Sequence, residues 1–226
     1  MKLKAIIFNL SGVIINDEDI NSKLTRNLLI DENIIATQQE YKKFCLGRGD
    51  RGIADLLQER GRLVTETYLQ KLIEQKNQAY QEYVKTLESI PIYKDIEQVL
   101  SEIKLRGLQI GLVSGAPNSQ AKFILEHLQL IKYFDVIVGE DEVEKAKPDP
   151  QSYLVATAKF QNISPEQCLA IEDTPVGIEA AKRAGIQVVG VAHTYPFHFM
   201  QRYSNWAVDY LVDIEWEWIE QTFASK

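Results

Sequence analysis

Short runs of apolar, mostly β-branched residues recur along the chain, and each is about as long as one buried strand. The runs lie at residues 5–8, 110–113, 136–138, 169–171, 188–191 and 210–212. Between the later runs, apolar residues recur with the helical period at residues 95–104, 119–128, 150–160 and 176–184. The alternation predicts parallel βαβ units, and the lack of polar alternation within the strands predicts a sheet covered on both faces. We therefore expect an α/β fold, a Rossmann-like doubly wound parallel sheet with strand order 3-2-1-4-5.

The stretch between the first two predicted strands, residues 16–91, is too long for a simple crossover. It contains no strand-like run, and its helical patterns lie at residues 21–29, 36–44, 53–61 and 66–87. We therefore expect an inserted all-helical cap domain at residues 16–91 and a core domain formed by residues 1–15 and 92–226. Residues 213–219 alternate acidic with bulky apolar side chains, which leaves a helix and an extended segment both open there.

Composition narrows the class of protein. The chain has 226 residues, of which 45% are hydrophobic and 25% charged, as in an ordinary globular protein. A formal net charge of −7 repels nucleic acid and anionic membranes, so we expect neither as a partner. Cys45 and Cys168 lie far apart without metal-ligand spacing, which predicts reduced thiols. No apolar run approaches the ~18 residues of a membrane span, and residues 1–4 do not resemble a signal peptide, so we expect cytoplasmic localisation.

Polar clusters follow four of the predicted strands. They are Asn9, Ser11 and Gly12 after the first strand, Ser114, Gly115 and Ala116 after the second, Lys147 after the third, and Glu172 and Asp173 after the fourth. In a doubly wound sheet, ligands bind beyond the carboxyl ends of the strands, where the strand order reverses. We therefore expect these clusters to meet at one edge of the sheet.

Each cluster suits a different part of a phosphate and metal site. The Ser114 hydroxyl and the backbone N–H groups of Gly115 and Ala116 precede a predicted helix, and such a turn cradles an anion. Lys147 adds a positive charge, and the adjacent carboxylates after the fourth strand are hard oxygen ligands that suit Mg²⁺. Ordinary turn and helix-cap chemistry explains each cluster by itself. Their coincidence at the strand ends favours one joint site.

These segments resemble the four motifs of the haloacid dehalogenase superfamily, in its phosphatase and β-phosphoglucomutase-like branch with a helical cap after motif one. The resemblance covers residues 5–12, 112–118, 147–150 and 171–185. The last segment is the most specific, because its acidic pair is followed by the glycine, Ala-Ala and Ala-Gly positions of the branch. The resemblance implies a Mg²⁺-dependent phosphohydrolase or phosphomutase that acts on a small phosphorylated metabolite such as a sugar phosphate.

Motif one departs from the family pattern at its two reactive positions. The family has Asp-x-Asp-Gly, in which the resemblance implies that the first aspartate attacks phosphorus and the second transfers protons; this chain has Asn9 and Ser11. A neutral amide is a weak nucleophile, and a serine hydroxyl does not titrate near neutral pH. The resemblance also implies metal ligands at Asn9, the Ser11 carbonyl, Glu172 and Asp173, and Asn9 carries no charge. We therefore expect a weakened Mg²⁺ site and impaired catalysis, with Lys147 in place at the reaction centre.

Three explanations of this departure remain open. A natural pseudoenzyme would keep the anion pocket without the chemistry. An engineered trap would usually change one carboxylate, whereas Asn16 here also replaces an aspartate usual in the family. An active enzyme would need a reactive group outside motif one, so the sequence leaves open whether the chain is an enzyme.

The most glycine-rich stretch of the predicted cap, residues 47–52, resembles the family's substrate-specificity loop. Its arginines, Arg48 and Arg51, are suited to binding a second phosphate or a sugar carboxylate in a bidentate manner. A plain turn between helices, with both arginines in solvent, explains the same residues equally well. The histidines have no spacing typical of metal ligands.

Overall fold

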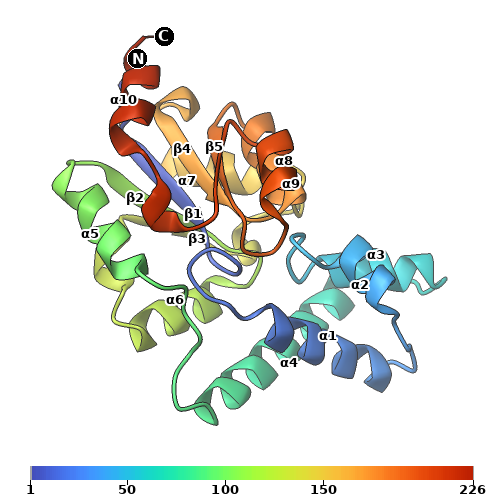
Figure 1. Cartoon of the computed structure of the whole chain (residues 1–226). Helices are drawn as coiled ribbons and strands as arrows, with labels where there is room; N and C mark the ends of the chain where they lie inside the picture. Colours follow the sequence, from blue (N-terminus) through green and yellow to red (C-terminus); the bar gives the residue numbers. More distant parts are fainter. Residues whose placement is uncertain (1, 226) are drawn as a thin grey trace.

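The structure, a computed structural model, describes residues 2–225. A parallel six-stranded sheet with order β3-β2-β1-β4-β5-β6 lies at its centre (Figure 1). Its strands are β1 (Ala5–Asn9), β2 (Gln109–Val113), β3 (Val136–Val138), β4 (Cys168–Glu172), β5 (Gln187–Val191) and β6 (Trp206–Val208). The predicted order of the first five strands is therefore confirmed.

Helices cover both faces of the sheet, because successive strand side chains point to opposite sides. Ile6 and Phe8 of β1 pack on the face covered by α5 (Ile96–Leu105), α6 (Asn118–His127) and α10 (Trp216–Ala224). Ala5 and Ile7 pack on the face covered by α7 (Gln151–Lys159), α8 (Pro175–Arg183) and α9 (Phe197–Tyr203). The doubly wound architecture is confirmed.

Four further helices lie between β1 and α5 in the chain. They are α1 (Glu18–Asp31), α2 (Gln38–Phe44), α3 (Gly52–Glu59) and α4 (Glu66–Lys85), and they gather beside one end of the sheet (Figure 1). All four contribute to an apolar cluster of their own, while Tyr80 and Val84 of α4 pack into the cluster of the sheet. The two connecting segments run side by side, since Asn16 N–H donates to the Pro91 carbonyl over 2.8 Å. The division of the chain at residues 16 and 91 stays a prediction.

The sixth predicted strand was placed wrongly. Residues 210–212 lead into a short 3₁₀ helix, Leu211–Asp213, and the strand is Trp206–Val208 instead. Only Leu211 of that apolar run is buried, whereas Tyr210 is 66% exposed, so the run does not line a sheet. The ambiguous tail forms α10, which buries Trp216, Ile219 and Phe223. Other 3₁₀ turns lie at Ile131–Tyr133, Glu140–Glu142 and Pro165–Gln167.

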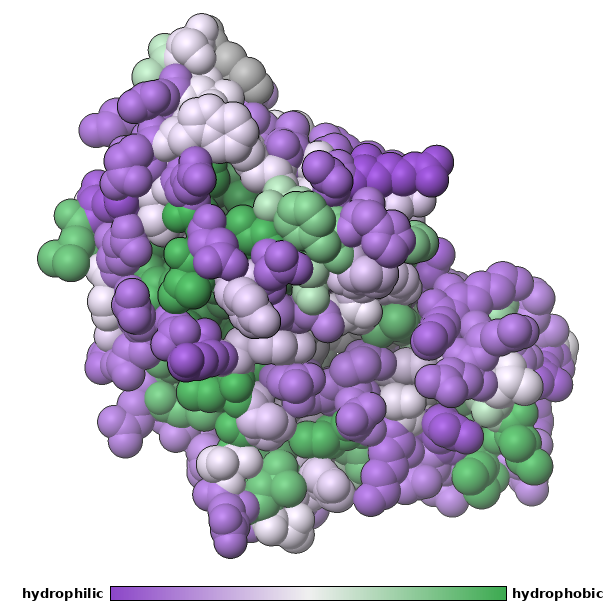
Figure 2. All heavy atoms as spheres, in the orientation of Figure 1, coloured by the Kyte–Doolittle hydropathy of each residue, from purple (hydrophilic) through white to green (hydrophobic). Residues whose placement is uncertain are grey.

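The face of the molecule drawn in Figure 2 is mostly polar, with groups of apolar residues among the polar ones. No helix within residues 2–225 has the length and apolar character needed to cross a membrane. Cys45 and Cys168 are both buried, free thiols, as the sequence predicted.

Candidate functional site

The carboxyl ends of β1, β2 and β4 bring the predicted polar clusters to one place. Asn9 is paired in register with Val113, the residue before Ser114, and Phe8 is paired with Ile171. This register puts Ser114 and Asp173 one residue beyond the level of Asn9, at the same edge of the sheet. All three side chains are buried, with 8%, 4% and 2% of their residues exposed. Strand pairing thus assembles the cluster that the sequence predicted.

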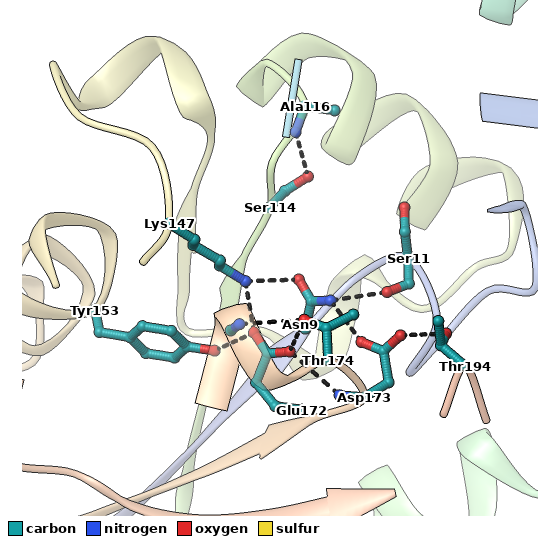
Figure 3. A network of polar contacts seen from close by, with 11 residues as sticks. Asn9, Ser11, Ser114, Ala116, Lys147, Tyr153, Glu172, Asp173, Thr174 and Thr194 are labelled. Atoms are coloured by element: carbon teal, nitrogen blue, oxygen red, sulfur yellow. Dashed lines mark hydrogen bonds and ion pairs between the residues drawn. The ribbon is translucent and has the colours of Figure 1, made fainter. Parts of the chain in front are cut away.

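Lys147 joins this cluster from the loop after β3 (Figure 3). Its ammonium donates to Asn9 Oδ1 over 3.0 Å and to Glu172 Oε1 over 2.6 Å. Tyr153 of α7 also donates its hydroxyl to Glu172 Oε1, over 2.7 Å. Because Lys147 and Glu172 are buried, this ion pair needs all of its hydrogen bonds to be stable.

The Asn9 side-chain amide links two further groups. Its Nδ2 donates to the Ser11 carbonyl over 2.8 Å and to Asp173 Oδ1 over 3.1 Å (Figure 3). The orientation of the amide follows from its neighbours, because Lys147 has only donors, whereas the Ser11 carbonyl and Asp173 carboxylate have only acceptors. Asn9 Oδ1 must therefore face Lys147, and the amide nitrogen must face the two oxygens.

Asp173 receives a second hydrogen bond that the sequence analysis missed. Thr194, in the loop after β5, donates its hydroxyl to Asp173 Oδ2. Burial, and after it the charge of Glu172, raises the pKa of Asp173 to about 7. Gly12 packs against the same carboxylate with a φ of +79°, and a Cβ there would lie 1.9 Å from Asp173 Oδ2. Extending the strand-end rule to β5 would have found Thr194.

The residues at this site do not fit a Mg²⁺ ion. The Ser11 carbonyl and Asp173 Oδ1 are suitable oxygen ligands, but the donor nitrogen of Asn9 already contacts both. Glu172 is engaged elsewhere, since its Oε1 accepts from Lys147 and its Oε2 from the Asp173 N–H over 3.2 Å. Across residues 2–225, no three or more His, Cys, Asp and Glu side chains are grouped as metal ligands.

The predicted anion turn lies directly beneath the cap. Ala116 N–H donates to Ser114 Oγ over 3.0 Å, which leaves the Ser114 hydroxyl proton free to point elsewhere. The Gly115 carbonyl accepts from Asp50 N–H of the cap loop over 2.9 Å. Gly49 has a φ of +80°, and a Cβ there would lie 2.6 Å from the Gly115 carbonyl oxygen. The cap loop therefore closes tightly over Gly115.

A cavity of about 70 Å³ remains between the cap and the sheet. The sheet side contributes Asn9, Ser11, Gly115, Ala116, Lys147 and Asp173, and the cap side contributes Glu18, Asn21, Tyr41, Cys45, Asp50 and Lys76 among others. Side chains of the sheet and of the helical segment between β1 and α5 therefore face the same small space.

The cap side of this cavity contains a buried ammonium that the sequence analysis missed. Lys76 donates to Asp50 Oδ1 over 2.6 Å and to Asn21 Oδ1 over 2.8 Å, and it is 3% exposed. Nearby, Tyr80 donates its hydroxyl to Asp17 Oδ2 over 2.9 Å. Position 76 lies on the buried apolar stripe of α4, four residues before Tyr80. A lysine on such a stripe was the signal that could have identified it.

The two cap arginines do not line this cavity. Arg51 forms a bidentate ion pair with Glu66, at 2.7 and 3.2 Å, and Arg48 donates Nε to the Lys43 carbonyl over 3.1 Å. Both line a separate groove next to residues 144–148. Ser11 does line the cavity, and it is among the neighbours that oppose the burial-raised pKa of Asp17.

The contact between cap and core predicts a pH-dependent stability. Glu140 is 3% exposed, its Oε2 accepts from Arg51 N–H over 3.0 Å, and its Oε1 has no hydrogen-bond partner among the described residues. Burial, and after it the charge of Asp50, raises the pKa of Glu140 well above its usual value, while Arg51 and Lys76 oppose the shift. Folding therefore favours the protonated form, and ionisation of Glu140 costs stability as the pH rises above its unfolded pKa of about 4.3.

Glu140→Gln should therefore be more stable than the parent protein at pH 8, by ~1–3 kcal/mol, and the difference should vanish as the pH falls towards ~4. Urea unfolding of both proteins across this pH range measures the effect. Glu144→Gln, a change at an exposed position, is the matched control and should show no such trend. A pH-independent difference for Glu140→Gln would contradict the assignment.

Three comparisons place the chain among known proteins. The sequence model of the family described as haloacid dehalogenase-like hydrolase matches residues 6–191. The chain is 28% identical over 195 residues to the phosphorylated carbohydrates phosphatase of Thermotoga maritima, covering 85% of this chain and 87% of the relative. It is 31% identical over 196 residues to the β-phosphoglucomutase of Bacillus subtilis, covering 86% and 85%.

A solved structure has the same fold over the whole chain. The β-phosphoglucomutase from Clostridium difficile matches with a TM-score of 0.84 and 26% sequence identity, covering 99% of this chain and 98% of that one. The matched family region contains β2 to β5, all of β1 except Ala5, and the strand-end clusters of Asn9, Ser114, Lys147 and Asp173, whereas Thr194 lies beyond it. The chain therefore belongs to the haloacid dehalogenase-like hydrolases and is close to their phosphatase and β-phosphoglucomutase members.

Proposed function

We propose that this chain binds a small phosphorylated metabolite of the sugar-phosphate class between sheet and cap, and that it transfers the phosphoryl group poorly or not at all. The names of its relatives, a phosphorylated carbohydrates phosphatase and a β-phosphoglucomutase, support the ligand class. The proposed loss of activity rests on the hydrogen bonds of Asn9, whose side-chain amide donates to the Ser11 carbonyl and to Asp173. An amide held in this way is not an attacking group.

The phosphate contacts of the proposal come from groups that are intact at the sheet edge. Gly115, Ala116 and Lys147 line the cavity, and Lys147 supplies the positive charge. Ser114 does not line the cavity, but its Oγ accepts from the Ala116 N–H beside it. In this proposal, Arg48 and Arg51 bind the part of the substrate beyond the phosphate after the cap has opened. Mg²⁺ should bind weakly at most, because Asn9 contributes no charge and Glu172 is paired with Lys147.

Other side chains of the cavity are poor substitutes for the missing nucleophile. Burial raises the pKa of the Cys45 thiol to about 12, so the thiolate is scarce near neutral pH. Burial also raises the pKa of Tyr41 above its usual value. Since activated nucleophiles need a lowered pKa or a partner base, neither group suits phosphoryl transfer.

An active phosphohydrolase or phosphomutase is the second candidate, and the names of the relatives favour it. The similarity to a phosphorylated carbohydrates phosphatase and to a β-phosphoglucomutase covers 85% and 86% of this chain. Phosphate release by the unaltered protein from any sugar phosphate would support this candidate over the first.

In this proposal, residues 16–91 form a cap that opens over a core formed by residues 1–15 and 92–226. The protein is cytoplasmic and has no nucleic-acid partner. The acidic net charge of −7 and the free, buried thiols support these points.

Binding of inorganic phosphate tests the proposal directly. The parent protein should bind phosphate with a Kd in the millimolar range or tighter, about −4 kcal/mol or better, measured by calorimetric titration. Lys147→Ala should weaken binding at least ~10-fold, because the loss of a charged hydrogen-bond donor costs ~1.5–3 kcal/mol. Lys145→Ala, two residues away at an exposed position, is the matched control and should bind as the parent does.

Because Lys147→Ala leaves Glu172 without its cation, the folded state of each variant is checked by circular dichroism before titration. Ser114→Ala, which keeps the Lys147 ion pair, provides a second measurement and should also weaken binding. Equal phosphate affinity in all four proteins would refute the assignment of this site.

A further inference from the structure

The centre of the site is occupied by a nitrogen where the surrounding oxygens converge. Asn9 Nδ2 lies 2.8 Å from the Ser11 carbonyl oxygen and 3.1 Å from Asp173 Oδ1. These two acceptors come from the turn after β1 and from the end of β4, 162 residues apart in the chain. Each N–H of one amide group therefore satisfies one of them, a position that a divalent cation between the two oxygens would otherwise occupy.

A metal ion between the Ser11 carbonyl and Asp173 is incompatible with the hydrogen bonds that Asn9 Nδ2 donates to both. To ligate a cation between the Ser11 carbonyl and Asp173, Asn9 would have to turn its Oδ1 inwards. Its NH₂ group would then face the Lys147 ammonium, which is now 3.0 Å from Oδ1, and two donors would meet without an acceptor. A buried donor without a partner is unfavourable, so the side-chain amide opposes metal binding beyond its lack of charge.

The charges of the cluster agree with this arrangement. Glu172 and Asp173 are two carboxyl groups that face one ammonium, Lys147, and Asn9 is neutral. An aspartate at position 9 would add a third carboxylate to one ammonium at nearly complete burial, and that arrangement would require a further cation. Compared with an aspartate at position 9, Asn9 has one negative charge less, and the cluster does not need a further cation to balance that charge.

We propose that the Asn9 side-chain amide takes the place of the divalent cation, so that the phosphate site is assembled and binds its anion without metal. This inference rests on the proposed function for the identity of the anion, and it deepens that function by making the binding metal-independent. It further implies that the single substitution Asn9→Asp creates a requirement for Mg²⁺ that the parent protein lacks.

Thermal unfolding with and without Mg²⁺ tests the inference in the absence of any catalytic assay. The parent protein should have the same Tm in a chelator and in excess Mg²⁺. Asn9→Asp should have a lower Tm in the chelator and gain about 5–10 °C in Mg²⁺ at ~100 times its Kd. Asn33→Asp adds the same charge at an exposed position and should show no Mg²⁺ response. Asn9→Asp combined with Asp173→Asn should lose the response again.

Phosphate titrations of the parent protein, in chelator and in Mg²⁺, separate the two proposals. Equal phosphate affinity in both conditions supports the inference. A parent Tm that rises in Mg²⁺, or phosphate binding that appears only in Mg²⁺, overturns it, even if Asn9→Asp fails to fold. If the parent binds no phosphate in either condition while only Asn9→Asp responds to Mg²⁺, the proposed function is refuted and the role of Asn9 stands.

Discussion

Replacing both Asn9 and Ser11 by aspartate is expected to give this chain a phosphoryl-transfer activity that neither single substitution reaches. Asn9→Asp returns a carboxylate nucleophile at the end of β1, and Ser11→Asp returns a group that moves the proton. A general acid or base contributes ~10²- to 10⁴-fold, so the double variant should exceed Asn9→Asp by a factor in that range. The measurement is phosphate release from a panel of sugar phosphates in the presence of Mg²⁺.

The surroundings of Ser11 favour this outcome. Asp17 is a fully buried carboxyl group whose pKa is raised by burial, and Ser11 is among the neighbours that oppose that rise. The carboxyl group introduced by Ser11→Asp would lie beside Asp17, and two adjacent carboxyl groups do not both ionise readily. One of them would remain protonated near neutral pH, which is the state that a general acid requires.

The single variants serve as the controls of this experiment. Ser11→Asp alone should release no phosphate, because no attack on phosphorus precedes the proton transfer. Asn9→Asp alone should turn over slowly, so that the double change acts more than additively. If the unaltered protein matched the double variant on any substrate, another group would carry the chemistry. If none of the four proteins released phosphate, a binding role would be the better account.

The sequence predicted the fold where a short apolar run coincided with full burial. The apolar residues of β1 to β5 form such runs and are buried apart from Ile137 of β3, and the helical segments between the later strands indicate parallel crossovers. The strand at the edge of the sheet was not predicted. β6 has only three residues, Trp206, Ala207 and Val208, and all three are only partly buried. Residues 210–212 were predicted as the strand instead, but Tyr210 and Val212 are exposed. The hydrophobicity of three residues alone does not distinguish this exposed run from the edge strand at residues 206–208.

The candidate site was predictable in its members but not in its hydrogen bonds. Strand ends place Asn9, Lys147 and Asp173 together, because parallel strands share one carboxyl edge. Which atom of Asn9 faces which neighbour depends on Lys147, 138 residues later in the chain, and no local pattern contains that information. The role of the buried Lys76 could likewise not be predicted, because it depends on the ion pair with Asp50. Asp50 lies in the loop between α2 and α3.

Lys76→Met is expected to destabilise the protein by ~3–5 kcal/mol, the cost of removing one partner from a buried ion pair. Burial opposes the charge of Lys76, but the carboxylates around it, Asp50 first, outweigh burial and hold its pKa above the usual value. Methionine fills a similar volume and offers no donor, so Asp50 and Asn21 would both lose their partner. The free energy of unfolding in urea measures the loss.

Two further variants show whether the ion pair is the cause. Lys71→Met changes an exposed lysine of the same helix and should alter stability by no more than ~0.5 kcal/mol. Lys76→Met combined with Asp50→Asn should recover part of the loss, because the second change removes the uncompensated charge. If Lys76→Met cost no more than Lys71→Met, Lys76 would be hydrated in solution. The cap loop that carries Asp50 would then lie away from Gly115, and the resting state of the protein would be the open one that admits a sugar phosphate.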